Sequence, residues 1–145
     1  MNQEIKYQNR QLYCECQLVS LWNAKRFLEN IPEMGSKQYK KICEESYCVA
    51  GSCLNKNKEI ERLNLKAIKG KMTLEWIKNH LPVQFSVFCH RGYHCVLAIA
   101  VKKEKILLTN YTKGKLHWMS WKKLKEIHNR HLRPIQWKVR YKKGT

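Results

Sequence analysis

The sequence predicts an α+β protein in which helices precede an antiparallel sheet. Two observations lead to this prediction. In the first half of the chain apolar residues recur at helical spacing, whereas from Val83 onward they alternate with polar residues or form short continuous runs, as strands do. No repeat, low-complexity linker or change of composition divides the chain. Residues 1–145 are therefore expected to form a single domain with N-terminal helices packed on a C-terminal sheet.

The expected helices lie mainly before residue 82. They cover about residues 14–29, 36–45, a polar stretch up to residue 63, and 74–81. The first is the longest and most apolar, so it should be buried. Thr73 is a good N-cap for the last of them, and Pro82 should end it.

Three strands are expected over 83–89, 94–101 and 105–110. The middle one is apolar on both faces and should be central in the sheet. A tight hairpin turning around Lys102 would set His94 opposite Asn110. Ser120 should cap a short helix, and alternation from Ile135 onward predicts a last strand.

The charge of the chain is strongly positive and unevenly distributed. Its 29 Lys and Arg against 11 acidic residues give a net charge of +18, and Glu104 and Glu126 are the only acidic residues after Val101. Such a basic C-terminal third favours a polyanion, nucleic acid or an acidic partner, although a solvated surface is the simpler alternative. The longest apolar run, 95–101, is too short to cross a membrane. No secretory signal is recognised, so a cytoplasmic location is expected.

The seven cysteines do not suggest a disulfide framework, because their number is odd and no export signal accompanies them. Their spacing with histidines also differs from that of the usual zinc knuckles. No metal or other cofactor is therefore predicted. Most of the cysteines are interpreted as small buried apolar residues.

Four residues form a candidate catalytic group. A thiol is nucleophilic as the thiolate, which a helix N-terminus and a neighbouring imidazolium both favour. Cys14 should open the long helix, and His94 at the head of the central strand can act as its base. Asn110 can orient the imidazole, and Gln8 can donate to an oxyanion beside the Cys14 backbone N–H.

Short motifs around these residues resemble a known family. The run Gln8-Asn-Arg-Gln-Leu-Tyr-Cys14 resembles the Gln-x5-Cys signature of papain-like cysteine peptidases, and residues 92–97 resemble their Gly-x-His-x-Val strand. The chain is more closely similar to the bacteriocin-processing, double-glycine leader peptidases, including the turn over 110–114. The resemblance implies a papain-like fold, with Cys14, His94, Asn110 and Gln8 as its catalytic residues.

Three functions remain open. The first is a cysteine peptidase that hydrolyses a peptide bond in a peptide or protein substrate through an acyl-enzyme intermediate. The second is an inactive papain-like scaffold, a basic binding or virion-associated protein able to contact nucleic acid, which Glu15 next to the nucleophile favours. The third is a nucleic-acid-binding domain that uses the basic last strand. Gln11 and Cys16 form an alternative, less well spaced pair of oxyanion donor and nucleophile.

Overall fold

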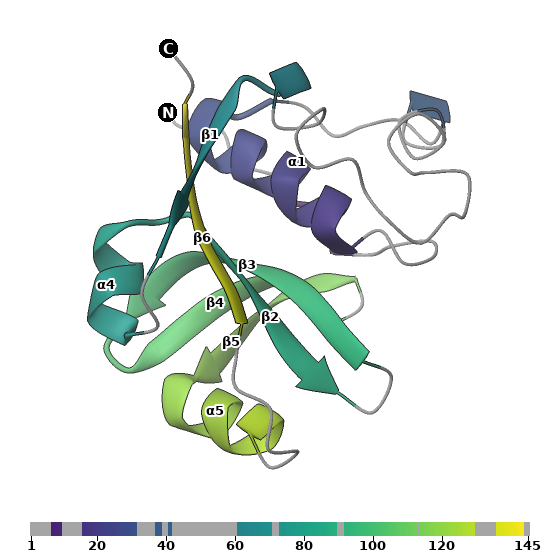
Figure 1. The fold of residues 1–145 in the computed structure, drawn as a ribbon. Helices are drawn as coiled ribbons and strands as arrows, with labels where there is room; N and C mark the ends of the chain where they lie inside the picture. Colours follow the sequence, from purple (N-terminus) through teal and green to yellow (C-terminus); the bar gives the residue numbers. More distant parts are fainter. Residues whose placement is uncertain are drawn as a thin grey trace.

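The computed structural model of the chain is an α+β protein (Figure 1). The structure describes residues 7–9, 16–31, 37–38, 41, 61–70, 73–89, 92–112, 114–129 and 136–143. The helices bounded within these ranges are α1 (Cys16–Glu29), α4 (Leu74–Asn79) and α5 (Trp121–Asn129). The strands are β1 (Leu65–Lys69), β2 (Val83–Cys89), β3 (Gly92–Lys102), β4 (Lys105–Thr112), β5 (Lys115–Ser120) and β6 (Gln136–Lys143).

The described strands form one antiparallel sheet in the order β1-β6-β2-β3-β4-β5. This confirms the predicted strands over 83–89, 94–101 and 105–110, which are β2, β3 and β4. β3 is paired on both sides, as its apolar composition predicts. The predicted C-terminal strand is β6, which lies between β1 and β2.

The expected register between β3 and β4 is wrong by two residues in the part of the hairpin nearest His94. Lys102 pairs with Lys105, so the chain turns after Lys102 and not at Lys102 itself. Further from the turn, Leu97 pairs with Thr109. A bulge between Ala98 and Ala100 shifts the pairing on the way. Symmetry about the turn could not reveal this bulge, because it inserts an extra residue into one strand without an evident sequence signal.

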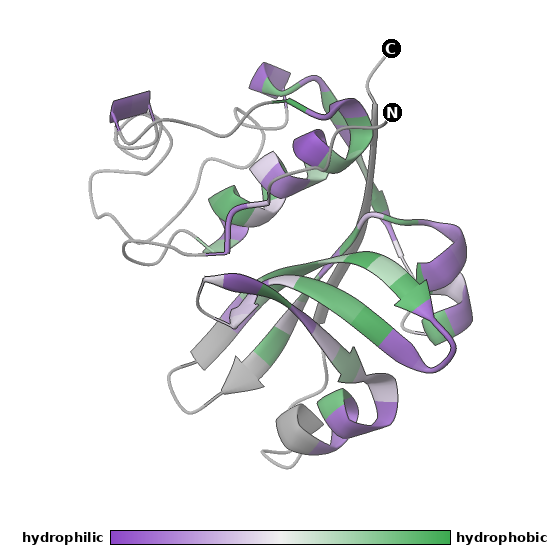
Figure 2. Ribbon diagram, turned by 180° about the vertical axis from the view of Figure 1, so that it is seen from behind, coloured by the Kyte–Doolittle hydropathy of each residue, from purple (hydrophilic) through white to green (hydrophobic). Residues whose placement is uncertain are grey.

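Helices cover both faces of the sheet and create two separate cores. On one face, α1 buries an apolar surface, including Leu18 and Leu21, against Leu97 of β3. On the other face, Ile77 of α4 and Leu124 of α5 are fully buried in a second cluster. Figure 2 shows the resulting distribution: the central strands are largely hydrophobic, whereas the short helices carry both hydrophobic and hydrophilic residues.

Two predicted helix caps are confirmed. Thr73 Oγ1 accepts a hydrogen bond of 3.2 Å from the Trp76 backbone N–H at the start of α4. Ser120 Oγ accepts one of 3.0 Å from the Lys123 backbone N–H at the start of α5. Both side chains satisfy N–H groups that have no partner inside the helix. Among the helices that the structure describes, none is long and apolar enough to span a membrane.

The sequence did not predict β1 and β5. β1 pairs with β6 from the end of the chain, and β5 pairs with β4. Both are short, with five and six residues, and their alternation of apolar and polar residues is weak. Such strands form because a neighbouring strand offers free backbone groups, so tertiary context decides them rather than local sequence.

Candidate active site

Three elements meet near the start of β3. Cys16 is the first residue of α1, His94 and Cys95 lie on β3, and Asn110 lies near the end of β4. α1 packs against β3 and β4, and this packing brings Cys16 to His94 and Cys95. The side chains of Cys16, His94 and Cys95 are half-buried, which shields them partly from water while leaving them accessible.

The Cys16 thiol ionises at unusually low pH. Hydrogen bonds from the Cys95 side chain, His94 and the Cys95 backbone N–H, together with the charge of His94, lower its pKa to about 4 against the opposing effect of burial. An ordinary cysteine has a pKa of about 8.5. Since the thiolate is the nucleophilic form, Cys16 has the ionisation state that covalent catalysis requires at neutral pH.

His94 is held between this thiol and a backbone carbonyl. Its Nε2 lies 2.7 Å from the carbonyl oxygen of Asn110. A carbonyl only accepts hydrogen bonds, so Nε2–H donates this one. The ring is also hydrogen-bonded to the Cys16 thiol. Burial lowers the pKa of His94, but the hydrogen bonds to Cys16 and Asn110 and the thiolate charge outweigh burial and raise it. The site therefore stabilises a thiolate–imidazolium pair.

Asn110 presents its carbonyl from a left-handed backbone conformation with φ of 55°. Asparagine tolerates this conformation better than most residues. Its N–H donates to Asn9 Oδ1 at 2.9 Å, and the Gly114 N–H donates to the Asn9 carbonyl at 3.0 Å. Asn9 thus fixes the backbone that holds His94. The sequence predicts that the Asn110 side-chain amide orients the ring, whereas the bond that the structure shows comes from its main chain.

Gln8 is anchored to α1 through its main chain. Its N–H donates to Asn23 Oδ1 at 2.9 Å, and Asn23 Nδ2 donates back to the Gln8 carbonyl at 2.9 Å. Asn23 lies about two helical turns after Cys16. Gln8 is therefore fixed beside the middle of the helix. The role of the Gln8 side chain as an oxyanion donor stays a prediction.

Cys95 and Ser86 are site residues that the sequence did not single out. Ser86 Oγ and Cys95 Sγ are hydrogen-bonded at 3.2 Å, and the two residues are paired across β2 and β3. Ser86 is buried. The hydroxyl therefore holds the thiol that contacts Cys16. The only sequence signal for Cys95 was its position directly after His94. Nothing in the sequence indicated its contact with Ser86.

The predicted nucleophile Cys14 lies outside the described residues, as do Gln11 and Glu15. The preference for Cys14 therefore stays a prediction. Among the residues that are described, the cysteine in contact with His94 through its side chain is Cys16, the alternative nucleophile from the sequence.

Comparisons with family models, with curated proteins and with solved structures found no match to this chain. Within the described ranges, no three His, Cys, Asp or Glu side chains gather as metal ligands would. The chemistry of the site follows from its own groups. An ionised thiol and a hydrogen-bonded imidazole with a fixed ring can together form and break a covalent bond to an electrophilic carbon.

Proposed function

We propose that the chain is a cysteine peptidase of papain-like architecture, with Cys16 as the nucleophile and His94 as the general base and acid. The observation that carries the proposal is the hydrogen-bonded Cys16–His94 pair, whose ring is held by the Asn110 carbonyl at 2.7 Å. The order along the chain supports it: a helix with the thiol, a strand with the imidazole, and the next strand with the orienting group.

The proposed reaction has two stages. The Cys16 thiolate attacks the carbonyl carbon of a peptide bond, and the His94 imidazolium gives its proton to the departing amine, which leaves a thioester on Cys16. Neutral His94 then takes a proton from a water molecule, whose oxygen attacks the thioester. The acid product leaves and the Cys16 thiolate is restored.

Two donors are proposed for the oxyanion that forms in each stage. The N–H of Cys16 is the first, because the backbone N–H of the nucleophile lies beside the carbonyl oxygen of the bond that it attacks. The Gln8 side chain is the second, because Asn23 fixes its main chain beside α1. Loss of one such donor typically slows turnover by about 10²–10³-fold.

Peptide cleavage tests the proposal. The full chain is incubated with a mixed library of decapeptides, and new termini are identified by mass spectrometry. Wild type should cleave a subset of the peptides, whereas Cys16→Ala and His94→Ala should cleave none. Cys14→Ala is the matched control, because it removes the other candidate nucleophile and should leave cleavage intact. Wild-type cleavage by Cys16→Ala would contradict the proposal, and an inactive wild type would favour the binding scaffold.

A further inference from the structure

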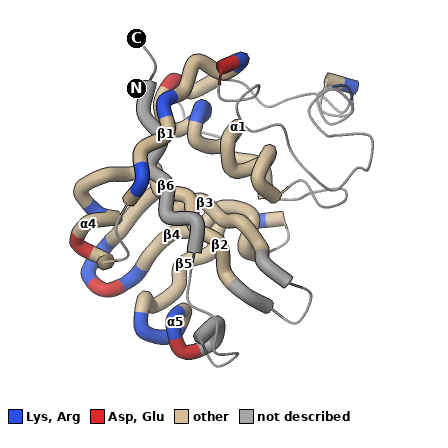
Figure 3. The backbone as a smooth tube through the Cα atoms, in the orientation of Figure 1, with Lys and Arg blue, Asp and Glu red and all other residues tan. Residues whose placement is uncertain are grey.

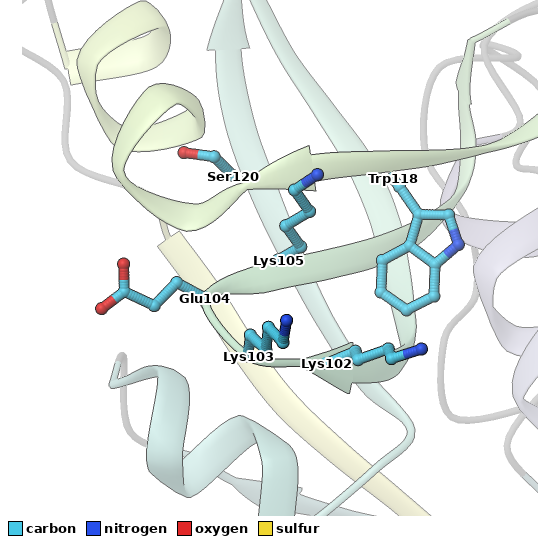
Figure 4. A pocket seen from close by; sticks show the side chains of 6 residues that line it. All are labelled: Lys102, Lys103, Glu104, Lys105, Trp118 and Ser120. Carbon is cyan, nitrogen blue, oxygen red and sulfur yellow. The ribbon is translucent and has the colours of Figure 1, made fainter.

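A surface hollow lies at the end of β3 that is remote from Cys16. Figure 4 shows the side chains that line it, and its volume is about 630 Å³. It is lined by Lys102, Lys103, Glu104, Lys105, Trp118 and Ser120. Lys105 pairs with Lys102 on one side and with Ser120 on the other, so β3, β4 and β5 all contribute. Eight residues of β3, or roughly 25 Å of strand, separate His94 from Lys102. The hollow is therefore distinct from the candidate active site.

Trp118 brings an exposed aromatic ring to this hollow. Its side chain is 45% exposed, which distinguishes it from the other large hydrophobic residues whose side-chain exposure the structure describes. Leu116, two residues earlier on β5, packs against the core beneath α1. Residues two apart on a strand share a face, so Trp118 continues this apolar face beyond the core. An indole in this position offers a flat π surface on which another ring can stack.

Three exposed lysines from the β3–β4 hairpin line the hollow beside the indole. These hairpin lysines are Lys102, Lys103 and Lys105. Figure 4 shows Lys102 extending beneath the Trp118 ring, and Glu104 pointing away from it. Positive charge continues onto α5, where Figure 3 shows further basic positions. The exposed lysines there are Lys122, Lys123 and Lys125.

We propose that this hollow binds single-stranded nucleic acid, with a base stacked on Trp118 and the adjacent phosphates contacted by the hairpin lysines. A base within a duplex is already stacked on its neighbours, whereas a base of a single strand is free to stack on a protein ring, which favours a single strand over a duplex. The lysines supply the phosphate contacts, which carry no sequence preference. An acidic peptide would use the lysines but leave the indole without a partner. This binding site does not depend on the proposed peptidase activity.

Binding of the full chain to a fluorescently labelled 12-mer of deoxythymidylate, followed by anisotropy, tests the stacking contact. Trp118→Ala should weaken binding roughly 5- to 150-fold, the range found when a stacking aromatic is replaced by alanine. Trp118→Phe keeps a flat ring and should retain most of the affinity. Because Trp118 is exposed, both variants should melt near the wild-type temperature, which circular dichroism checks.

The salt dependence tests the charge contact. If the hairpin lysines neutralise three phosphates, these contacts account for a roughly 20-fold loss of affinity between about 50 and 200 mM salt. Replacing all three lysines by glutamine should remove this share of the salt dependence. A variant with glutamine at Lys66, Lys69 and Lys78 is the control. These lysines are also exposed, and they lie on β1 at the opposite edge of the sheet and on α4.

Four results would overturn the proposal. Trp118→Ala could bind the 12-mer as tightly as wild type, the control triple variant could lose as much affinity as the hairpin triple variant, or a duplex of the same length could bind as tightly as the single strand. If polyglutamate displaced the labelled 12-mer as well as the unlabelled 12-mer does, the partner would be an acidic protein, and the proposal would be rejected. A selective loss in the Trp118→Ala and hairpin variants would support it.

Discussion

The position of Asn110 offers a test of which of its groups orients His94. The carbonyl of Asn110 accepts the Nε2–H bond at 2.7 Å, and any residue at this position retains that carbonyl. What the residue must do is adopt φ of 55°. Glycine adopts this conformation readily, whereas alanine pays about 1–2 kcal/mol for it relative to the right-handed region.

These values predict two different stabilities. Asn110→Ala should destabilise the fold by about 1 kcal/mol, because asparagine tolerates the left-handed region better than alanine does. Asn110→Gly should be more stable than Asn110→Ala by up to about 1 kcal/mol, since the strain of about 1–2 kcal/mol that it avoids exceeds its larger unfolded-state entropy of about 0.4–1 kcal/mol. Both variants lose the contacts of the buried Asn110 side chain, so these contacts do not affect the comparison. In a chain of 145 residues, a difference of 1 kcal/mol corresponds to about 2–4 °C in Tm. Thermal unfolding followed by circular dichroism measures it.

Thiol alkylation then separates the main chain from the side chain. Asn110→Gly keeps the carbonyl and the backbone conformation, so Cys16 should react with iodoacetamide near pH 6 at the wild-type rate. If the side-chain amide held the ring instead, Asn110→Gly would slow alkylation as strongly as His94→Ala does. That result would refute the assignment of the orienting role to the main-chain carbonyl.

Three further outcomes follow from the same site. The alkylation rate of Cys16 should rise through about pH 4 and stay level to neutral pH, because its lowered pKa keeps the thiolate present above that value; a rise only near pH 8–9 would contradict this. Asn9→Ala should destabilise the fold by about 1–3 kcal/mol in urea unfolding, because it removes the acceptor of the buried Asn110 N–H, whereas Asn9→Asp should cost less. Peroxide should oxidise the Cys16 thiolate to a sulfenic acid, which the contacting Cys95 thiol converts to a disulfide with loss of water. In Cys95→Ser this disulfide cannot form, so the sulfinic acid should accumulate on Cys16, which mass spectrometry detects.

Much of the fold could be predicted because local patterns agree with it. The period-two alternation of β2, the apolar run of β3 and the helical spacing of α1 each depend on residues close in sequence. The caps Thr73 and Ser120 are also local signals. β1 and β5 could not be predicted in this way, because they are stabilised by pairing with strands that supply the missing hydrogen-bond partners.

The candidate site was predicted in part for the same reason. His94 and Asn110 belong to one hairpin, so counting along the strands brings them near each other even though the bulge changes the register. The contact of Asn9 with Asn110 joins residues 101 positions apart and has no local signal. Nor does spacing alone reveal that Cys95 contacts Cys16, since that contact depends on how α1 packs on the sheet.

The most direct test of the central claim is to identify which cysteine reacts first with iodoacetamide near pH 6, by peptide mapping of the full chain after brief labelling. Cys16 should be modified before the other six cysteines, because its thiolate is already formed at that pH. Labelling should be lost in Cys16→Ala, persist in Cys14→Ala, and be slowed in His94→Ala. Selective modification of Cys14, with Cys16→Ala still labelled at the wild-type rate, would contradict the assignment of Cys16 as the nucleophile.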